Sequence, residues 1–250
     1  MNAPAPLPAS IDLWNRLTDV GGDDGVELDR LTWQLRKLAA RQPSDFLTRL
    51  TLALALLMRG LRSEALPHVE AAYGLRHGHG RANILDLSFA LLESGCLREA
   101  EELLTRLLEV PEAAGDTHLY AVAMGFALRI GDVAFMKRSL DATRVQHEEG
   151  ADFVALLEQD GLIDAFRRHQ EIVESLLGPV TCTFRASIDY DDEGFLSAGV
   201  DYYTDLAGRA RLEMYRPLAE ATMGPDLVEV SLRVTIGIWG PQVQVVEDAA

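Results

Sequence analysis

The chain has 250 residues, of which 48% are apolar and 25% are charged, and its formal net charge is −16. This length and composition indicate an ordinary globular protein with one large domain or two smaller ones. The negative charge argues against a nucleic-acid partner and against binding to anionic membrane surfaces, because both depend on concentrated Lys and Arg side chains.

The first nine residues predict a disordered or extended tail, since they contain Pro4, Pro6 and Pro8. They lack the positively charged and apolar regions of a secretory signal. The most apolar run, Leu50 to Met58, is too short to span a bilayer. The presence of only two cysteines is consistent with a reducing compartment. We therefore expect a cytoplasmic protein without a membrane partner.

Apolar residues spaced three and four apart predict helices along most of residues 10–178. The predicted ranges are 10–18, 26–41, 45–58, 62–75, 80–94, 97–109, 116–130, 133–147, 152–159 and 162–177. Either Ser44 or Asp45 is suited to cap the amino end of the helix over 45–58.

Matching glycines divide these helices into hairpins. Gly95 lies 35 residues after Gly60, and Gly131 lies 36 residues after Gly95. Self-similarity at this period is typical of stacked helix-turn-helix repeats. Ala65 and Ala100 each follow a turn glycine by five residues, and such small side chains allow two helices to approach closely. The spacing therefore predicts three hairpins and a fainter fourth around Gly161.

After Gly178-Pro179 the period changes from helical to two, which predicts strands. The predicted strands cover residues 180–190, 195–203, 210–214 and 228–238, with a short one at 243–245. The expected fold class is α+β, with a helical-hairpin domain over 10–178, a sheet domain over 179–246 and an acidic tail over 247–250. The sheet is expected to be antiparallel, to have four to five strands and to need a cover for its apolar face.

The helical section resembles the tetratricopeptide repeat (TPR) family over about residues 44–147. The matching residues are Gly60, Ala65 and Ala72 in one repeat and Gly95 and Ala100 in the next. The chain departs from the family because no Trp stands near the start of a repeat. The resemblance implies an α-solenoid whose concave groove, lined by the first helix of each pair, binds a peptide or protein segment.

The groove of the family falls on mostly apolar positions of this sequence. They are Leu47, Leu50, Leu54, Leu57, Met58, Leu85, Phe89, Leu92, Ala121 and Leu128, together with Ala82, Glu93, His118, Gly125 and Arg129. The charged clamp with which chaperone-binding members hold an acidic carboxyl terminus is absent. The resemblance therefore implies a client with an apolar segment. The alternative is that the protein's own sheet or tail fills the groove, because a helix that is apolar on every face is usually buried on every face.

Two other clusters have simple structural interpretations. His77-Gly78-His79-Gly80 predicts a turn, since two histidines are too few to hold a metal ion. Asp189, Asp191, Asp192 and Glu193 could bind a divalent cation or act as an acid and a base, but a solvated hairpin turn is the simpler interpretation. The sequence contains no phosphate loop, dinucleotide fingerprint, nucleophile elbow or zinc motif, so no cofactor is expected.

The leading hypothesis is a non-enzymatic adaptor or dedicated chaperone that binds an apolar client segment in the helical groove. One alternative is an acidic protein that neutralises a basic partner. The other is an enzyme with a carboxylate site on the sheet. Pairing of two copies through an exposed sheet edge is a further hypothesis.

Overall fold

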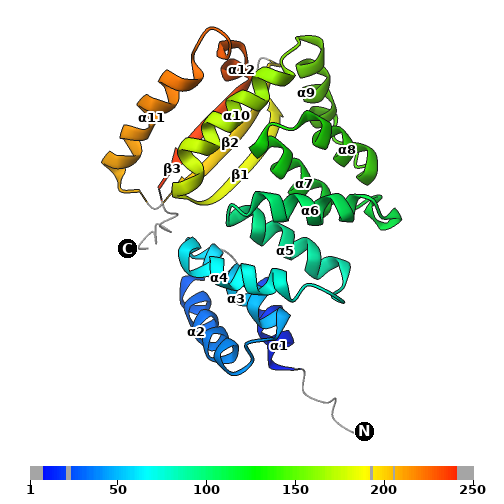
Figure 1. The fold of residues 1–250 in the computed structure, drawn as a ribbon, viewed down its shortest axis with the longest axis vertical. Helices are drawn as coiled ribbons and strands as arrows, with labels where there is room; N and C mark the ends of the chain where they lie inside the picture. The colour runs from blue at the N-terminus through cyan, green and yellow to red at the C-terminus, as the bar shows by residue number, and fades with distance from the viewer. Residues whose placement is uncertain (1–7, 21–23, 192–193, 205, 241–250) are drawn as a thin grey trace, which may run out of the picture. The chain divides into compact units, whose positions relative to one another are not determined.

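The structure is a computed structural model, and it describes residues 8–20, 24–191, 194–204 and 206–240 (Figure 1). The chain divides into two compact units. We call the described residues up to Ser94 the N-terminal unit and those from Gly95 onward the C-terminal unit. Each unit has its own core and is described by itself below.

The N-terminal unit consists of helices at the predicted places. They are α1 (Ala9–Asp19), α2 (Gly25–Arg41), α3 (Phe46–Met58), α4 (Arg62–Gly74) and α5 (Arg81–Glu93). Asp45 caps α3, because its carboxylate accepts a hydrogen bond of 3.0 Å from the Thr48 backbone N–H. The predicted ranges and one of the two predicted caps are therefore confirmed.

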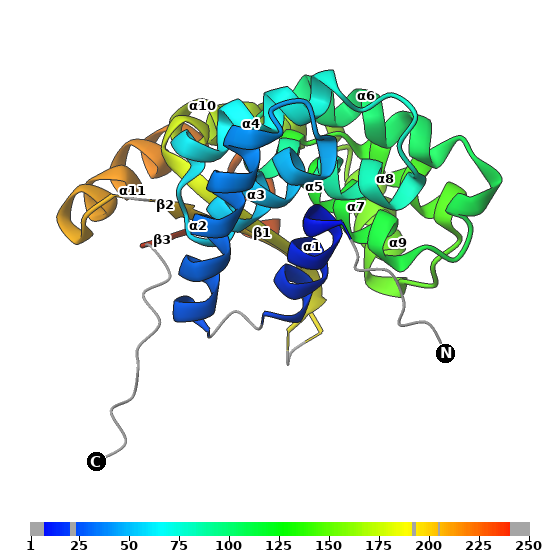
Figure 2. The same ribbon diagram turned by 90° about the horizontal axis from the view of Figure 1, so that it is seen from below.

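Helix α3 is the centre of the N-terminal unit. It contacts α1, α2, α4 and α5, as Figure 2 shows from below. Most of its side chains are buried, including Leu50, Leu52 and Leu56. Ala65 and Ala72 of α4 are fully buried, which agrees with the expectation that small residues permit close helix packing.

The C-terminal unit begins with helices and ends in a mixed region. Its elements are α6 (Leu97–Leu108), η1 (Pro111–Ala113), α7 (Thr117–Ile130), α8 (Val133–Thr143), α9 (Glu148–Gln159), α10 (Ile163–Leu177), η2 (Gly178–Val180), β1 (Thr181–Tyr190), β2 (Leu196–Thr204), α11 (Gly208–Thr222), α12 (Val228–Arg233) and β3 (Val234–Trp239). Gly131 and Gly161 adopt left-handed backbone conformations (φ 70° and 67°), as a hairpin turn between two helices requires.

The predicted sheet is wrong in strand number and direction. The described residues form three strands in the order β1-β2-β3, with β1 antiparallel and β3 parallel to β2. The strand predicted over 210–214 is part of α11, and the first half of the strand predicted over 228–238 is α12. The strand predicted at 243–245 lies outside the described residues.

The error has a physical cause. Three alternating apolar residues in 210–214 are a weak strand signal, and ion pairs between residues four apart add a small preference for a helix. Arg209 lies 3.0 Å from Glu213, and Arg216 lies 2.8 Å from Glu220, each one helical turn apart. With α11 and α12 between them, β2 and β3 are joined by a helical crossover, and such a connection brings strands parallel.

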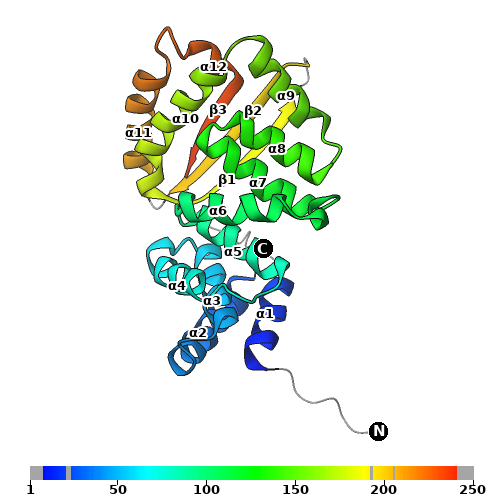
Figure 3. The ribbon, with the colours of Figure 1, turned by 45° about the vertical axis from the view of Figure 1, so that its right-hand side comes forward.

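One face of the sheet is buried and the other is open to solvent. Alternate residues such as Phe184, Tyr202 and Ile238 lie on the buried face. Helices α7, α9 and α12 pack on the strands, and Figure 3 shows α7 beside β1 and β2. On the opposite face, Arg185 and Asp189 of β1 are exposed. The expectation that helices cover the apolar face of the sheet is confirmed within this unit.

The outer edge of β3 is covered by α11, which lies along it in Figure 1. The Tyr215 hydroxyl donates a hydrogen bond to the Ile238 carbonyl (3.2 Å) and accepts one from the Ile238 N–H (2.9 Å). One side chain therefore satisfies both backbone groups that Ile238 directs away from β2.

Candidate functional site

The predicted groove positions of α3 form a line along one side of the helix. Leu47, Leu54 and Met58 are separated by seven and four residues, so they lie on one helical face. Leu47 and Leu54 are half-buried, and Met58 is 48% exposed. This line is the part of α3 that is least covered, because almost all other side chains of the helix are buried.

Helix α5 repeats this arrangement in the same unit. Ala82 and Phe89, seven residues apart, are exposed on one face, and Phe89 has 39% of its surface exposed. Because α3 and α5 contact each other, the two lines belong to neighbouring helices. We call Leu47, Leu54, Met58 and Phe89 the apolar line.

Five leucines among the predicted groove residues are core residues. Leu50, Leu57, Leu85, Leu92 and Leu128 are all buried, with at most 4% of their surface exposed. Side chains covered to this degree have no surface to offer to a partner in this conformation. Sequence reasoning placed them in the groove because the first helices are apolar on all sides, and that pattern does not distinguish a lining face from a packed one.

In the C-terminal unit, the sheet covers the corresponding face of α7. A Cβ atom at Gly125 would lie 3.6 Å from Cζ of Phe184, which belongs to β1. The Arg129 guanidinium lies 5.0 Å from the centre of the same ring. Ala121, one turn before Gly125, is exposed. At Gly125 and Arg129, the face of α7 that the resemblance assigns to a groove is covered by Phe184 of the sheet.

A buried ion pair lies beneath this contact. Arg129 is completely buried, and its Nε and Nη2 atoms donate to the two carboxylate oxygens of Glu174 on α10, both at 2.8 Å. Burial, together with the charge of Glu174, raises the pKa of the nearby Tyr202 hydroxyl well above its usual value. The Arg129 end of this ion pair is fully buried while the Glu174 side chain keeps 22% of its surface exposed, and such a pair is suited to fixing the packing of α7 against α10. In the sequence, the one indication of this ion pair is that Arg129 is a single arginine near the end of an apolar helix.

His169 on α10 is a second buried polar residue. Its side chain is 1% exposed, and desolvation lowers its pKa to about 4. Its Nδ1 atom lies 3.4 Å from the side-chain nitrogen of the adjacent Gln170. The ring is therefore neutral at physiological pH and serves as a core residue.

Of the predicted carboxylate cluster, the structure describes Asp189 and Asp191, and Asp191 is part of a turn. Asp191 accepts a hydrogen bond of 2.7 Å from the Phe195 N–H, which stabilises the β1–β2 turn. Asp189 is exposed on β1. Asp192 and Glu193 lie outside the described residues. Asp191 therefore has a structural use that does not require a ligand.

A hollow of about 440 Å³ lies between α9 and this turn. It is lined by Asp152, Ala155, Leu156, Gln159, Asp160, Tyr190, Gly194, Phe195, Leu196 and Arg233. The Tyr190 hydroxyl donates to Asp152 at 2.6 Å, and the Arg233 guanidinium lies 4.1 Å from the centre of the Phe195 ring. Much of the polar lining is thus already engaged by neighbouring side chains.

The histidine-glycine sequence forms the turn between α4 and α5. Gly78 has a φ of 84°, a conformation that favours glycine, and the His79 ring stacks on Phe46 with 3.9 Å between ring centres. Within the described ranges, no group of three or more His, Cys, Asp or Glu side chains is arranged to hold a metal ion.

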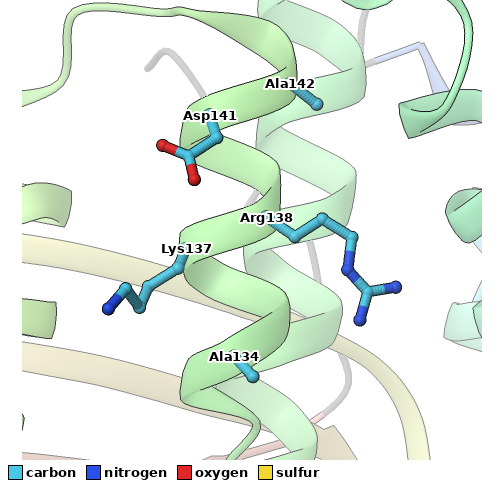
Figure 4. Close-up of a pocket in the computed structure, with 5 residues that line it drawn as sticks. All are labelled: Ala134, Lys137, Arg138, Asp141 and Ala142. Carbon is cyan, nitrogen blue, oxygen red and sulfur yellow. The ribbon is translucent and has the colours of Figure 1, made fainter.

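A second depression, of about 610 Å³, lies on α8. Figure 4 shows its lining residues, Ala134, Lys137, Arg138, Asp141 and Ala142, which all belong to this one helix. Lys137 is paired with Glu158 of α9 at 2.7 Å. A depression walled by a single helix surrounds no ligand, so we assign no function to it.

Comparisons with protein-family models, with curated proteins and with solved structures gave no match. Among the helices of the described residues, none has the length and apolar character needed to cross a bilayer. The fold and the surfaces are therefore the basis for assigning a function. They define a mainly helical protein with a small mixed sheet.

Proposed function

We propose that the protein is a TPR-like interaction module, an adaptor or dedicated chaperone, that binds an apolar segment of a client protein on the apolar line of α3 and α5. The observation that carries the proposal is the exposure of Met58 and Phe89 at two groove positions. The left-handed turn glycines at Gly60, Gly95 and Gly131, spaced by about one repeat, support the solenoid interpretation.

The chemistry of the apolar line suits a helical or extended client segment. Methionine adapts its shape to different partners, and an aromatic ring contributes a large contact area. The half-buried Leu47 and Leu54 extend the surface along α3. An amphipathic helix presents apolar residues at a similar spacing, so its apolar face could lie along this line.

The test is co-purification from the cells that make the protein, followed by quantitative mass spectrometry. Met58→Asp combined with Phe89→Asp places two charges on the apolar line, and we expect loss of the partners that wild type recovers. Both side chains are exposed at 39% or more, so the variant should remain folded.

The matched control is Val26→Asp, which adds a charge at a valine of α2 that is 83% exposed in the same unit. This variant should recover the wild-type partners. Equal recovery by the Met58→Asp/Phe89→Asp variant, with an unchanged circular dichroism spectrum, would refute the proposed site.

A second candidate function is the neutralisation of a basic partner, and the distribution of charge favours it. Residues 1–94 hold eleven acidic and ten basic side chains, so nearly all of the net charge of −16 lies in residues 95–250. Association through that charge should slow steeply as ionic strength rises. Binding on the apolar line should change little with salt, which separates the two candidates.

A further inference from the structure

We propose that two copies of the protein pair through the outer edges of β1, in antiparallel register centred on Ser187. The proposal goes beyond client binding and assigns a surface in the C-terminal unit to a second copy of this chain. It rests on the open edge of β1 and on two charged side chains that this register makes complementary.

The edge of β1 opposite β2 is open. Strand β1 is ten residues long and stands at the end of the strand order, and within the described part of the chain no strand pairs with its second edge. The other end of the sheet is covered by Tyr215, as described above. A long strand edge without a partner strand is a template for strand addition.

The hairpin shows which backbone groups face outward. Asp191 donates its N–H to the Phe195 carbonyl at 3.0 Å, and in this ladder Asp191 is opposite Phe195. Residues of β1 with odd numbers therefore bond to β2, and those with even numbers direct their N–H and C=O groups to the open edge. Antiparallel pairing of two such edges must place even residues opposite even residues.

Arg185 and Asp189 select one register among those allowed. Both are exposed on the outer face of β1, and among the described residues neither forms an ion pair. They cannot pair within one strand, because four residues of extended chain separate their Cα atoms by about 13 Å. The carboxylate across from Arg185 is Asp201, which accepts a hydrogen bond of 2.7 Å from the Trp239 indole.

Centring the pairing on Ser187 places Arg185 of each copy opposite Asp189 of the other. The two-fold axis produces this contact twice. Both pairs fall at positions that are not hydrogen-bonded, where opposing Cα atoms are about 4.5 Å apart and side chains are closest. The strand therefore carries a self-complementary charge pattern, as an interface between identical surfaces requires.

The first test measures oligomeric state by sedimentation velocity of the full chain. Wild type should be dimeric at micromolar concentration. Arg185→Asp and Asp189→Arg should each raise the dissociation constant at least about tenfold, because each places like charges opposite one another twice. An equimolar mixture of the two variants should dimerise again, since every pair in the mixed dimer is complementary. The double variant Arg185→Asp/Asp189→Arg should likewise recover the wild-type constant.

The second test fixes the register. Ser187→Cys, in a background with Cys96→Ser and Cys182→Ser, should form an intermolecular disulfide under mild oxidation, because the two Cα atoms lie within the range that a disulfide spans. Ser197→Cys is the matched control, since it lies on the same face but on the central strand β2. A monomeric wild type, a dimer unaffected by the single charge variants, or equal cross-linking of both cysteine variants would overturn the proposal.

Discussion

Helices α3 and α7 occupy equivalent places in the repeat period, yet their equivalent faces have different surroundings. Two turn spacings of 35 and 36 residues relate Leu54 and Met58 of α3 to Gly125 and Arg129 of α7. In α3 these positions are half-buried and exposed apolar side chains. In α7 a glycine leaves room for the Phe184 ring and a buried arginine lies beside the same ring. The two positions therefore differ in step with the cover of the face: a glycine and an arginine where the sheet packs on α7, and apolar side chains on α3.

Helix α7 contains two residues that by themselves reduce stability, Gly125 and the buried Arg129. A glycine within a helix reduces stability by about 1 kcal/mol relative to alanine, and a buried charge requires a partner. The glycine is accounted for by the docking of β1, since Phe184 packs on Gly125, and the buried charge is paired with Glu174 of α10. No such arrangement is needed in α3, where the equivalent residues are apolar.

The largest effect should come from breaking the buried pair under α7. Glu174→Leu leaves the Arg129 guanidinium buried without its carboxylate, and we expect a loss of about 3–5 kcal/mol in the free energy of unfolding. Urea denaturation measures it. The double variant Arg129→Met/Glu174→Leu removes both charges and should recover most of the loss. If Glu174→Leu alone had wild-type stability, the ion pair would not be what holds α7 against α10.

A smaller loss in the free energy of unfolding should follow from acid pH, because the buried His169 is neutral in the folded protein. His169 has a folded-state pKa of about 4 and an ordinary unfolded value of 6.5, so the unfolded chain binds the proton more readily. The stabilisation that results from this pKa difference is complete above pH 6.5 and is lost as the pH falls towards 4. The loss should reach roughly 2 kcal/mol at pH 5.

Chemical denaturation of wild type and His169→Gln at pH 7 and pH 5 isolates this contribution, because other groups titrate alike in both proteins. The difference between the two proteins should shrink at pH 5. His77→Gln, at an exposed turn position, is the control and should show no such change. An equal pH dependence in all three proteins would contradict a buried neutral histidine.

The smallest effect concerns the glycine that distinguishes the two helices. Gly125→Ala should raise the free energy of unfolding by up to about 1 kcal/mol, because helix propensity improves and the new Cβ meets Phe184 at an ordinary contact distance of 3.6 Å. Gly125→Leu should instead destabilise the protein, since its longer side chain competes with the Phe184 ring for space. Thermal unfolding compares the two. A stabilising leucine would show that Phe184 does not occupy this face.

The sequence predicted local structure better than it predicted contacts. Every helix up to α10 was predicted from apolar spacing, because a period of 3.6 residues is maintained for several turns in each. Helices α11 and α12 were missed, since short runs such as Val228 to Leu232 alternate like a strand and become helical only in their tertiary context.

The candidate site was predictable only in part. Met58 and Phe89 were identified by the repeat mapping, while five leucines given the same role are buried. The contact between Gly125 and Phe184 joins residues that are far apart in sequence, and no local pattern reports it. Likewise, the pairing of Arg129 with Glu174 requires knowledge of how α10 packs on α7. A single sequence does not contain that information in readable form.

The Tyr215 hydroxyl of α11, which is hydrogen-bonded to β3, limits how far the sheet can grow by strand addition. A sheet with two bare edges can add neighbours at both sides and continue into a ribbon of unlimited length, as in fibrils. Within the described residues, the Tyr215 phenol occupies the Ile238 backbone groups at the β3 edge, so strand addition is hindered there and left to the β1 edge. The proposed pairing of two copies uses that β1 edge in each. A single side chain on a covering helix therefore blocks strand addition at one edge, so that pairing through the other edge stops at two copies.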